Sequence, residues 1–320
     1  MSASEPAGEF GLIAWIRERS KAGGRVALGI GDDCASIRFT PGAEVLVTTD
    51  MLMDGRHFLL GEATPEQVGY KSLAVNLSDI AAMAGVPVAA FVAVALPRGS
   101  AVEVAQGLHA GMAPLAEAFG VTLAGGDTNA WDGPLVVTVT LLGETTPRGA
   151  IRRSGAQPGD AVLVTGSLGG SLLGRHLAPK PRVTEALALA EVASIHALID
   201  ISDGLASDLG HILEESGNLG ATLDAASIPI HDDAREASRL DGRPALDHAL
   251  NDGEDFELCL TVAPDEANRL LADPPQGVTL FWVGVIDADA DAGLRLRRTD
   301  GFISNLRAGG FDHLAGAGES

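Results

Sequence analysis

Five short segments place aspartate beside Gly, Ser, Thr or Asn where a strand or helix is expected to begin or end. They are GIGDDCA, TTDMLMDGRH, VNLSDIAAMAG, AGGDTN and IDISDGLASD, at residues 29–35, 48–57, 75–85, 124–129 and 199–208. Carboxylate and hydroxyl oxygens, together with substrate phosphates, are ligands that suit Mg²⁺. Five such clusters are hard to explain as five independent solvated loops. The sequence therefore predicts a site for divalent cations and phosphate.

The second of these segments brings the most candidate ligands together. A strand is expected over residues 45–47, followed by two hydroxyls and a carboxylate where the pattern changes to a loop. Because side chains alternate across a strand, Thr48 and Asp50 should share one face and Thr49 should lie on the other. Taken alone, the segment is equally well explained as an ordinary polar strand end, since short motifs often match by chance.

The best-marked helix begins after Thr64, a good N-cap whose partner in a capping box is Gln67. Within this helix Ser72, Asn76 and Asp79 recur at positions i, i+4 and i+7, so they form one polar stripe. A solvated face is the usual explanation of such a stripe. These side chains are short, whereas a typical wet face carries long charged ones. We therefore favour a buried polar stripe that faces a metal site.

The remainder of the first half is expected to alternate strands and helices. Apolar, β-branched residues predict strands over 88–96 and 135–142. Between them we expect a helix over 101–119 and a short strand over 121–124. Asp127 comes after two glycines at the end of that short strand. There a carboxylate or backbone N–H groups can reach a phosphate-bound metal ion.

The stretch from residue 143 to residue 160 is rich in Pro and Gly, and we place a domain boundary in it. Arg152 and Arg153 form a concentrated positive pair there, which suits either a phosphate contact or a solvated linker. A strand over 161–164, a glycine-rich loop over 165–171 and a helix are expected next. This order can cradle phosphate, but the loop is neither a GxGxxG nor a Walker A sequence.

A third acidic group lies farther along the second half. A strand is expected over 197–201, and Ser202 should cap a helix that begins near Asp203. A capped helix explains Ser202 and Asp203 but leaves Asp200 unexplained. Glu254 belongs to an acidic turn that leads into a strand, as either an exposed turn residue or a substrate contact.

Composition excludes several classes of protein. The 320 residues include 43 acidic and 22 basic ones, a net charge of −21, which argues against a non-specific binder of nucleic acid or anionic membranes. Cys34 and Cys259 form no CxxC pair, so a reduced, cytoplasmic protein is expected. The N-terminal residues do not resemble a signal peptide. The longest uncharged run, residues 80–96, is interrupted by Gly and Pro and is not a convincing membrane span.

Nine segments carry a family resemblance because they occur together and in order. They are GEFGLI, GIGDDCA, TTDMLMDGRHF, GYKSLAVNLSDIAAMAG, GGDTN, RSGAQPGD, VTGSLGG, IDISDGLASDLGHI and NDGEDFELC. The chain thereby resembles the thiamine-monophosphate kinase family, part of a larger group with aminoimidazole ribonucleotide synthetase and selenophosphate synthetase. The resemblance runs from about Gly8 to Asp312, and the ordered set is far more specific than any single segment.

The resemblance implies an α/β (α+β) fold of two synthetase-like domains. The N-terminal domain, residues 1–148, would bind ATP and Mg²⁺ and form a homodimer through its sheet. The C-terminal α/β domain would comprise residues 149–320. ATP and several Mg²⁺ ions would bind between the halves and across the dimer.

The resemblance also implies roles for individual residues. The metal ligands would be Asp33, Thr48, Thr49, Asp50, Asp79, Asp127, Asp200 and Asp203, with Asp50 and Asp127 the catalytic ones. The ATP contacts would be Gly126, Asp127, Arg153 and Ser202. The thiamine phosphate contacts would be His57, Glu254 and, as the nearest C-terminal aromatic residue, Phe311.

The implied reaction is direct transfer of the γ-phosphoryl group of ATP to thiamine monophosphate, giving thiamine diphosphate. The accepting oxygen is already anionic, so the main obstacle is bringing two anions together, which Mg²⁺ relieves by charge neutralisation and positioning. Two alternatives stay open. One is a sister ATP-dependent synthetase; the selenophosphate type is disfavoured because Cys34 lies among aspartates and the expected reactive Cys with a nearby Lys is not seen. The other is a non-catalytic protein that binds divalent metal and nucleotide.

Overall fold

The computed structural model describes residues 8–20, 23–289 and 293–306. Within them the chain divides into two compact units. Unit 1 contains the residues up to Ile80 together with Gly85–Ala150, and unit 2 contains Ala81–Ala84 and the residues from Ile151 onward. The change from one unit to the other after Ala150 falls in the turn-rich stretch 143–160. The mixed α/β class expected from the sequence is confirmed.

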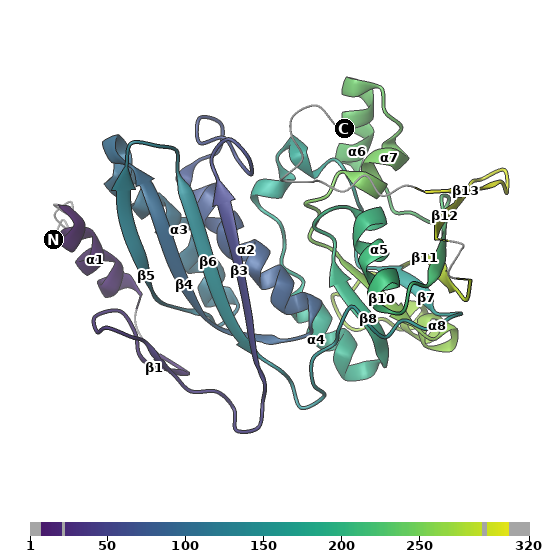
Figure 1. Cartoon of the computed structure of the whole chain (residues 1–320), viewed down its shortest axis with the longest axis horizontal. Helices are drawn as coiled ribbons and strands as arrows, with labels where there is room; N and C mark the ends of the chain where they lie inside the picture. The colour runs from purple at the N-terminus through teal and green to yellow at the C-terminus, as the bar shows by residue number, and fades with distance from the viewer. Residues whose placement is uncertain (1–7, 21–22, 290–292, 307–320) are drawn as a thin grey trace. The chain divides into compact units, whose positions relative to one another are not determined.

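Unit 1 is built on a four-stranded sheet with the strand order β3-β6-β4-β5. The strands are β3 (Val45–Met53), β6 (Val136–Glu144), β4 (Val86–Pro97) and β5 (Thr122–Trp131). Neighbouring strands are antiparallel except β4 and β5, which are parallel. Helices α2 (Pro65–Ala82) and α3 (Ala101–Ala118) cover one face of the sheet (Figure 1). The opposite face, which we call the open face, carries no helix in this view.

Alternation along β6 shows which side chains form the core of unit 1. Val137, Val139 and Leu141 are completely buried, whereas Thr138 and Thr140 between them are partly exposed. Because successive side chains point to opposite faces of a strand, the buried residues lie on the helix-covered face. The threonines therefore belong to the open face.

Smaller elements complete unit 1. They are α1 (Gly8–Arg19), β1 (Val26–Leu28), β2 (Ser36–Ile37) and the 3₁₀ turn η1 (Arg98–Ser100). Beyond α1, Ser20 Oγ lies 3.1 Å from Nε2 of His109 on α3. The chain near the β1–β2 pair is fastened by the buried Glu144, which accepts hydrogen bonds from the backbone N–H and hydroxyl of Thr40 at 2.8 Å each.

Unit 2 contains a seven-stranded sheet in the order β13-β12-β9-β11-β7-β10-β8. The strands are β7 (Ala161–Val164), β8 (Ile195–Asp200), β9 (Gly220–Asp224), β10 (Leu258–Val262), β11 (Phe281–Asp287), β12 (Leu294–Arg297) and β13 (Ile303–Asn305). The helices are α4 (Val183–Val192), α5 (Leu205–Glu215), α6 (Asp232–Asp241), α7 (Ala245–Asn251) and α8 (Pro264–Ala272). Val164, Ile199 and Leu223 from three strands pack with Leu209 and Ile212 of α5 in one buried core.

Two strands run farther than the sequence indicates. The strand expected over 45–47 continues to Met53, because β6 pairs with every residue of β3. The short strand expected over 121–124 continues to Trp131 beside β4, so Asp127 lies inside it. The strand-end positions expected for Asp50 and Asp127 are therefore wrong. Hydrogen bonding to a neighbouring strand keeps these polar residues extended.

Two expectations about helices in unit 2 are also wrong. The glycine-rich loop leads into two 3₁₀ turns, η2 (Ser171–Leu173) and η3 (Arg175–Leu177), and not into an α-helix. Helix α5 begins at Leu205 with Gly204 as N-cap, so Ser202 is not the capping residue. In unit 1, by contrast, the capping box is confirmed: the Thr64 N–H donates to Gln67 Oε1 at 2.9 Å and the Gln67 N–H to Thr64 Oγ1 at 3.3 Å.

None of the helices in the described part of the chain combines the length and the apolar character that a membrane crossing would need.

Candidate functional site

Asp50, Thr48 and Asp79 form an acidic group in unit 1. Thr48 and Asp50 share a face of β3 with the buried Leu46 and Leu52, as the alternation predicts. The Thr48 hydroxyl donates to a carboxylate oxygen of Asp79 on α2. Burial, followed by the charge of Asp79 and a hydrogen bond with it, raises the pKa of Asp50 to about 7. The carboxylates of Asp50 and Asp79 thus lie close together, and ionising both is unfavourable unless a cation is bound.

Helix α2 delivers only one member of its polar stripe to this group. Ser72 and Asn76 are buried, as expected, but they donate to carbonyls of their own helix four residues earlier, at 2.7 and 3.0 Å. Asp79, one turn farther along, reaches β3. Ser72 and Asn76 of the stripe are therefore buried within the helix, and Asp79 contacts the strand.

Thr49 and Asp127 lie on the open face of the sheet. The Thr49 hydroxyl is 3.0 Å from the Thr140 hydroxyl on β6. Asp127 pairs in register with Ala93 of β4, and Ala93 pairs with Thr138, so all three side chains share the face of Thr140. The structure consequently does not gather the side chains of Thr49 and Asp127 with Asp50 and Asp79.

Asp50 and Asp127 are also separated across the sheet. They lie on β3 and β5, the two edge strands, with β6 and β4 between them. Three strand spacings correspond to about 14 Å. One Mg²⁺ ion cannot contact both carboxylates within a single copy of this chain, because its ligands lie about 2 Å away.

A cavity of about 720 Å³ lies along β5 in unit 1. Its polar rim includes Asp33, Gly126 and Asp127, three residues expected to contact metal or ATP. Its apolar wall includes Val92, Val94, Leu108 and Met112. Gly126 is required where it stands, because its φ is +153° and a Cβ there would lie 1.8 Å from the Val92 carbonyl oxygen. An apolar cavity with a few polar groups at its rim is typical of small-molecule sites.

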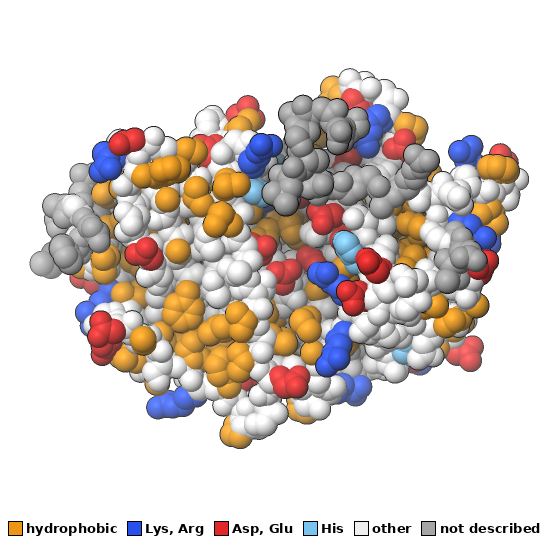
Figure 2. Space-filling model, viewed as in Figure 1, with side chains coloured by type: hydrophobic (Ala, Val, Ile, Leu, Met, Phe, Trp, Pro, Cys, Tyr) orange, Lys and Arg blue, Asp and Glu red, His pale blue; other side chains and the backbone are white. Residues whose placement is uncertain are grey.

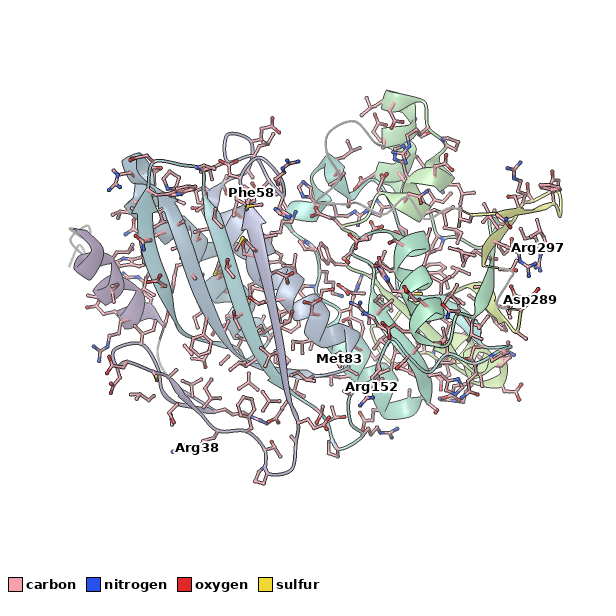
Figure 3. The ribbon with its side chains drawn as sticks, viewed as in Figure 1. Arg38, Phe58, Met83, Arg152, Asp289 and Arg297 are labelled. Carbon is pink, nitrogen blue, oxygen red and sulfur yellow. The ribbon has the colours of Figure 1, made fainter. Side chains whose placement is uncertain are left out.

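His57 ends the turn after β3 with a defined tautomer. The Met53 N–H donates to its Nδ1 at 3.0 Å, so in the neutral ring Nε2 carries the proton. The carbonyl of His57 accepts from Nζ of Lys71 at 2.8 Å, and Lys71 is completely buried. Figure 3 shows Phe58, the next residue, at the end of β3. A proton-bearing Nε2 suits an anionic acceptor.

In unit 2 Asp200 ends β8, Ser202 and Asp203 lie in the loop that follows, and the buried Asp208 lies near the start of α5. The Asp203 N–H donates to Asp208 Oδ2 at 3.0 Å. Burial, then the charge of Asp200, raises the pKa of Asp208 to about 8, although the backbone N–H groups of Asp203 and Ser202 oppose this shift. Oxygen or nitrogen atoms of Asp203, Asp208 and His211 lie within 4.8 Å of one another. Asp208 and His211 were missed, although both lie in the quoted motif.

Glu254 follows α7 in the loop before β10. Its side chain pairs with His176 of η3, with 3.0 Å between Oε2 and Nδ1. Its backbone N–H donates to the Ser202 carbonyl at 2.7 Å. The φ angle of Glu254 is +53°, in the left-handed region that residues other than glycine rarely adopt.

The glycine-rich loop is occupied by carboxylates of its own unit. The Gly169 N–H donates to both oxygens of Asp255, at 3.0 and 2.9 Å, and the Gly170 N–H to Asp252 at 3.0 Å. Nη2 of Arg175 also donates to Asp255 at 2.9 Å. The interpretation of this loop as a phosphate cradle is therefore wrong for these two N–H groups.

The remaining residues expected to contact phosphate, ATP or substrate lie at the start of unit 2 or outside the described residues. Arg152 and Arg153 have exposed side chains. Their backbone is held: the Arg152 carbonyl accepts from the Leu198 N–H at 3.0 Å. Figure 3 shows Arg152 beside Met83, whose carbonyl accepts from the Ile151 N–H at 3.2 Å. Phe311 lies outside the described residues.

Comparison with known proteins relates both units to one group of enzymes. The family model "AIR synthase related protein, N-terminal domain" matches residues 31–145, and its C-terminal counterpart matches residues 157–297. Thiamine-monophosphate kinase of Rhodopirellula baltica is 41% identical over 285 residues, which cover 87% of this chain and 89% of that protein. The solved thiamine-monophosphate kinase of Stenotrophomonas maltophilia has a TM-score of 0.77 and 37% identity, covering 92% of this chain and 97% of that one. A structure named "AaThiL complexed with AMPPCP and TMP" has a TM-score of 0.74 and 28% identity, covering 98% and 99%.

Proposed function

We propose that this chain, which belongs to the thiamine-monophosphate kinase family, transfers the γ-phosphoryl group of ATP to thiamine monophosphate, giving thiamine diphosphate and ADP. The observation that carries this proposal is similarity along nearly the whole chain to kinases of that name, one solved with AMPPCP and TMP. The donor set agrees with it, because carboxylates and hydroxyls are abundant and the acceptor, an ionised phosphate oxygen, requires no strong base.

The carboxylates of the two units fit Mg²⁺. Asp50 and Asp79 support this assignment most directly, since burial and the charge of Asp79, which raise the pKa of Asp50, oppose an ionisation that a bound cation would favour. We assign the metal contacts to Asp33, Thr48, Thr49, Asp50, Asp79 and Asp127 in unit 1 and to Asp200 and Asp203 in unit 2. When bound, Mg²⁺ would neutralise phosphate charge during transfer.

The other contacts follow from charge and shape. Gly126 and Asp127 at the rim of the cavity would meet ATP, and Arg153 and Ser202 would contact it from unit 2. His57 Nε2–H is suited to donate to the phosphate of the thiamine ester. Glu254, an anion, is suited to the thiazolium or amino group at the opposite end of that substrate. Phe311 stays a predicted substrate contact, and the cytoplasm stays the predicted location.

We further propose that the active form is a homodimer built on the open face of unit 1. Val45, Val47 and Met51 of β3 place large apolar side chains on that face, each about half exposed or more. Figure 2 shows apolar side chains gathered over this sheet. Such a patch is typical of a protein interface. Thr49 and Asp127 lie on the same face, so a second copy packed there could bring its Asp127 close to Thr49 of the first.

The reaction is tested by incubating the protein with ATP, Mg²⁺ and thiamine monophosphate and separating the products by chromatography. We expect thiamine diphosphate and ADP in equal amounts. ADP without thiamine diphosphate would direct the assignment to a sister synthetase. Binding of ATP with no turnover would favour the non-catalytic alternative.

Mixed dimers test whether Asp127 acts in the partner's site. Asp50→Asn and Asp127→Asn should each be nearly inactive alone. Unfolded and refolded together, they should regain about a quarter of wild-type activity, because half the dimers are mixed and each mixed dimer has one intact site. No regain, with dimers present by analytical ultracentrifugation, would contradict a shared site.

A further inference from the structure

The acidic turn at residues 251–257 is held by the segment at residues 165–182, through every one of its four carboxylates. Asp252 accepts from the Gly170 N–H, Asp255 from the Gly169 N–H and Arg175, and Glu257 from the Thr165 hydroxyl at 2.7 Å and from Arg182. Glu254 pairs with His176. The two segments are therefore built to fit each other.

Exposure separates Glu254 from the other three carboxylates of the turn. The side chains of Asp255, Glu257 and Asp252 are 1%, 8% and 10% exposed, whereas that of Glu254 is 23% exposed. Buried carboxylates whose oxygens accept hydrogen bonds within the chain serve the fold. Glu254 is the one of the four that a ligand can reach.

The backbone at Glu254 indicates that its side chain is needed. A residue with a Cβ at φ +53° is less favourable by about 1 kcal/mol, and glycine would avoid this strain. Its N–H donates to the carbonyl of Ser202, and Gly253 before it packs against the same carbonyl. The strained position thus ties Glu254 to the loop that carries Ser202 and Asp203.

His176 is itself fixed by its neighbour. Arg175 donates to the Gly169 carbonyl and to Asp255, both at 2.9 Å, and to Asp233 at 3.1 Å. Because Nε and Nη2 of Arg175 are both hydrogen-bonded, the single turn η3 cannot move without breaking these bonds. The His176 side chain is only 13% exposed and approaches one oxygen of Glu254, Oε2.

We propose that His176 is a positioning residue that holds Glu254 for the cationic or amino-bearing rings of the substrate and thereby sets the affinity for thiamine monophosphate. This inference rests on the proposed function and adds a residue that acts through Glu254. Repulsion directs the Glu254 anion away from the substrate phosphate and toward the thiazolium or the aminopyrimidine. ATP has no cationic ring for Glu254 to pair with, so its binding should depend far less on His176.

The test compares His176→Ala and His176→Asn with the wild-type enzyme in steady-state kinetics. Losing the contact between Nδ1 and the Glu254 carboxylate should raise KM for thiamine monophosphate about 10-fold or more. KM for ATP and kcat should stay within about twofold. Asparagine carries an N–H donor at the position of Nδ1, so H176N should recover most of the affinity.

His196→Ala is the matched control, because His196 pairs with a carboxylate of Asp160 at 2.8 Å in the same unit with a similarly covered side chain. It should leave KM for thiamine monophosphate unchanged. An unchanged KM in H176A, or equal losses in both KM values and kcat together with a fall in Tm, would overturn the proposal.

Failure of the inference can be separated from failure of the proposed function. If the wild-type protein forms no thiamine diphosphate, the proposed function fails. Calorimetric binding of thiamine monophosphate to wild type and to H176N and H176A then decides the inference alone. Binding weakened in H176A and largely restored in H176N supports it, whereas equal Kd values, or no binding to wild type, overturn it.

Discussion

Replacing Asp50 with asparagine should stabilise the protein without metal while strongly weakening its response to Mg²⁺. Asparagine has nearly the same shape but no charge, so both the cost of burying a charge and the repulsion from Asp79 disappear. The same change removes a proposed metal ligand. The two effects have opposite signs, and pH separates them.

The magnitude follows from the pKa of Asp50, which rises from 3.8 in the unfolded chain to about 7 in the folded protein. Above pH 7 ionising this group in the folded state costs roughly 4 kcal/mol, since one pKa unit corresponds to about 1.4 kcal/mol. At pH 5 the folded carboxyl is protonated while the unfolded one is mostly ionised, and the cost falls to roughly 1.6 kcal/mol. Metal-free wild type should thus lose roughly 2–3 kcal/mol relative to D50N between pH 5 and pH 8.

Urea denaturation of both proteins, with a chelator and with excess Mg²⁺, measures these free energies of unfolding. Mg²⁺ at 100 times its Kd should stabilise wild type by about 2.7 kcal/mol at pH 8 and D50N far less. Turnover of D50N should fall about 100-fold or more. Asp132→Asn, which removes an exposed carboxylate paired with Arg98, should change neither quantity. Parallel pH profiles, or equal stabilisation of D50N by Mg²⁺, would refute the reasoning.

Three further substitutions test the packing that positions the site. Gly126→Ala should lower the free energy of unfolding by several kcal/mol, because its Cβ would collide with the Val92 carbonyl. The control Gly99→Ala should be near neutral, since a Cβ there meets nothing within 4 Å. Similar urea midpoints for the two variants would contradict the close approach at Gly126. Arg182→Met should lower the free energy of unfolding by about 3–5 kcal/mol, because Glu257 and Glu185 would stay buried without this partner. The control Lys180→Met, at an exposed side chain, should lower it by less than about 1 kcal/mol. Thermal unfolding distinguishes the two variants, and equal losses of stability would argue against a buried network. Thr64→Ala should lower the free energy of unfolding by about 1 kcal/mol through loss of the α2 cap, whereas Thr64→Ser should keep most of that stability. An unchanged Tm in T64A would show that the cap does not stabilise the helix.

Local patterns in the sequence were sufficient for several features. The start of α2 depends on Thr64 and Gln67, three positions apart, and both of its hydrogen bonds form as the capping box predicts. The division of Thr48 and Asp50 from Thr49 depends only on alternation along one strand, and it is confirmed. The ordered motifs identified the family, because a set of motifs in a fixed order is specific even when the contacts between them are unknown.

Tertiary structure decided where these local features end and which groups meet. Whether β3 stops before Asp50 or continues to Met53 depended on β6, which comes more than 80 residues later in the chain. The glycine-rich loop resembled a phosphate cradle until Asp255, 86 positions away, was found to accept from its Gly169 N–H. The pairs His176 with Glu254 and Asp208 with Asp203 were likewise outside the reach of local patterns. The physical reason is range: caps and alternation depend on neighbouring residues, whereas strand length, burial of charge and pKa depend on groups that only folding brings together.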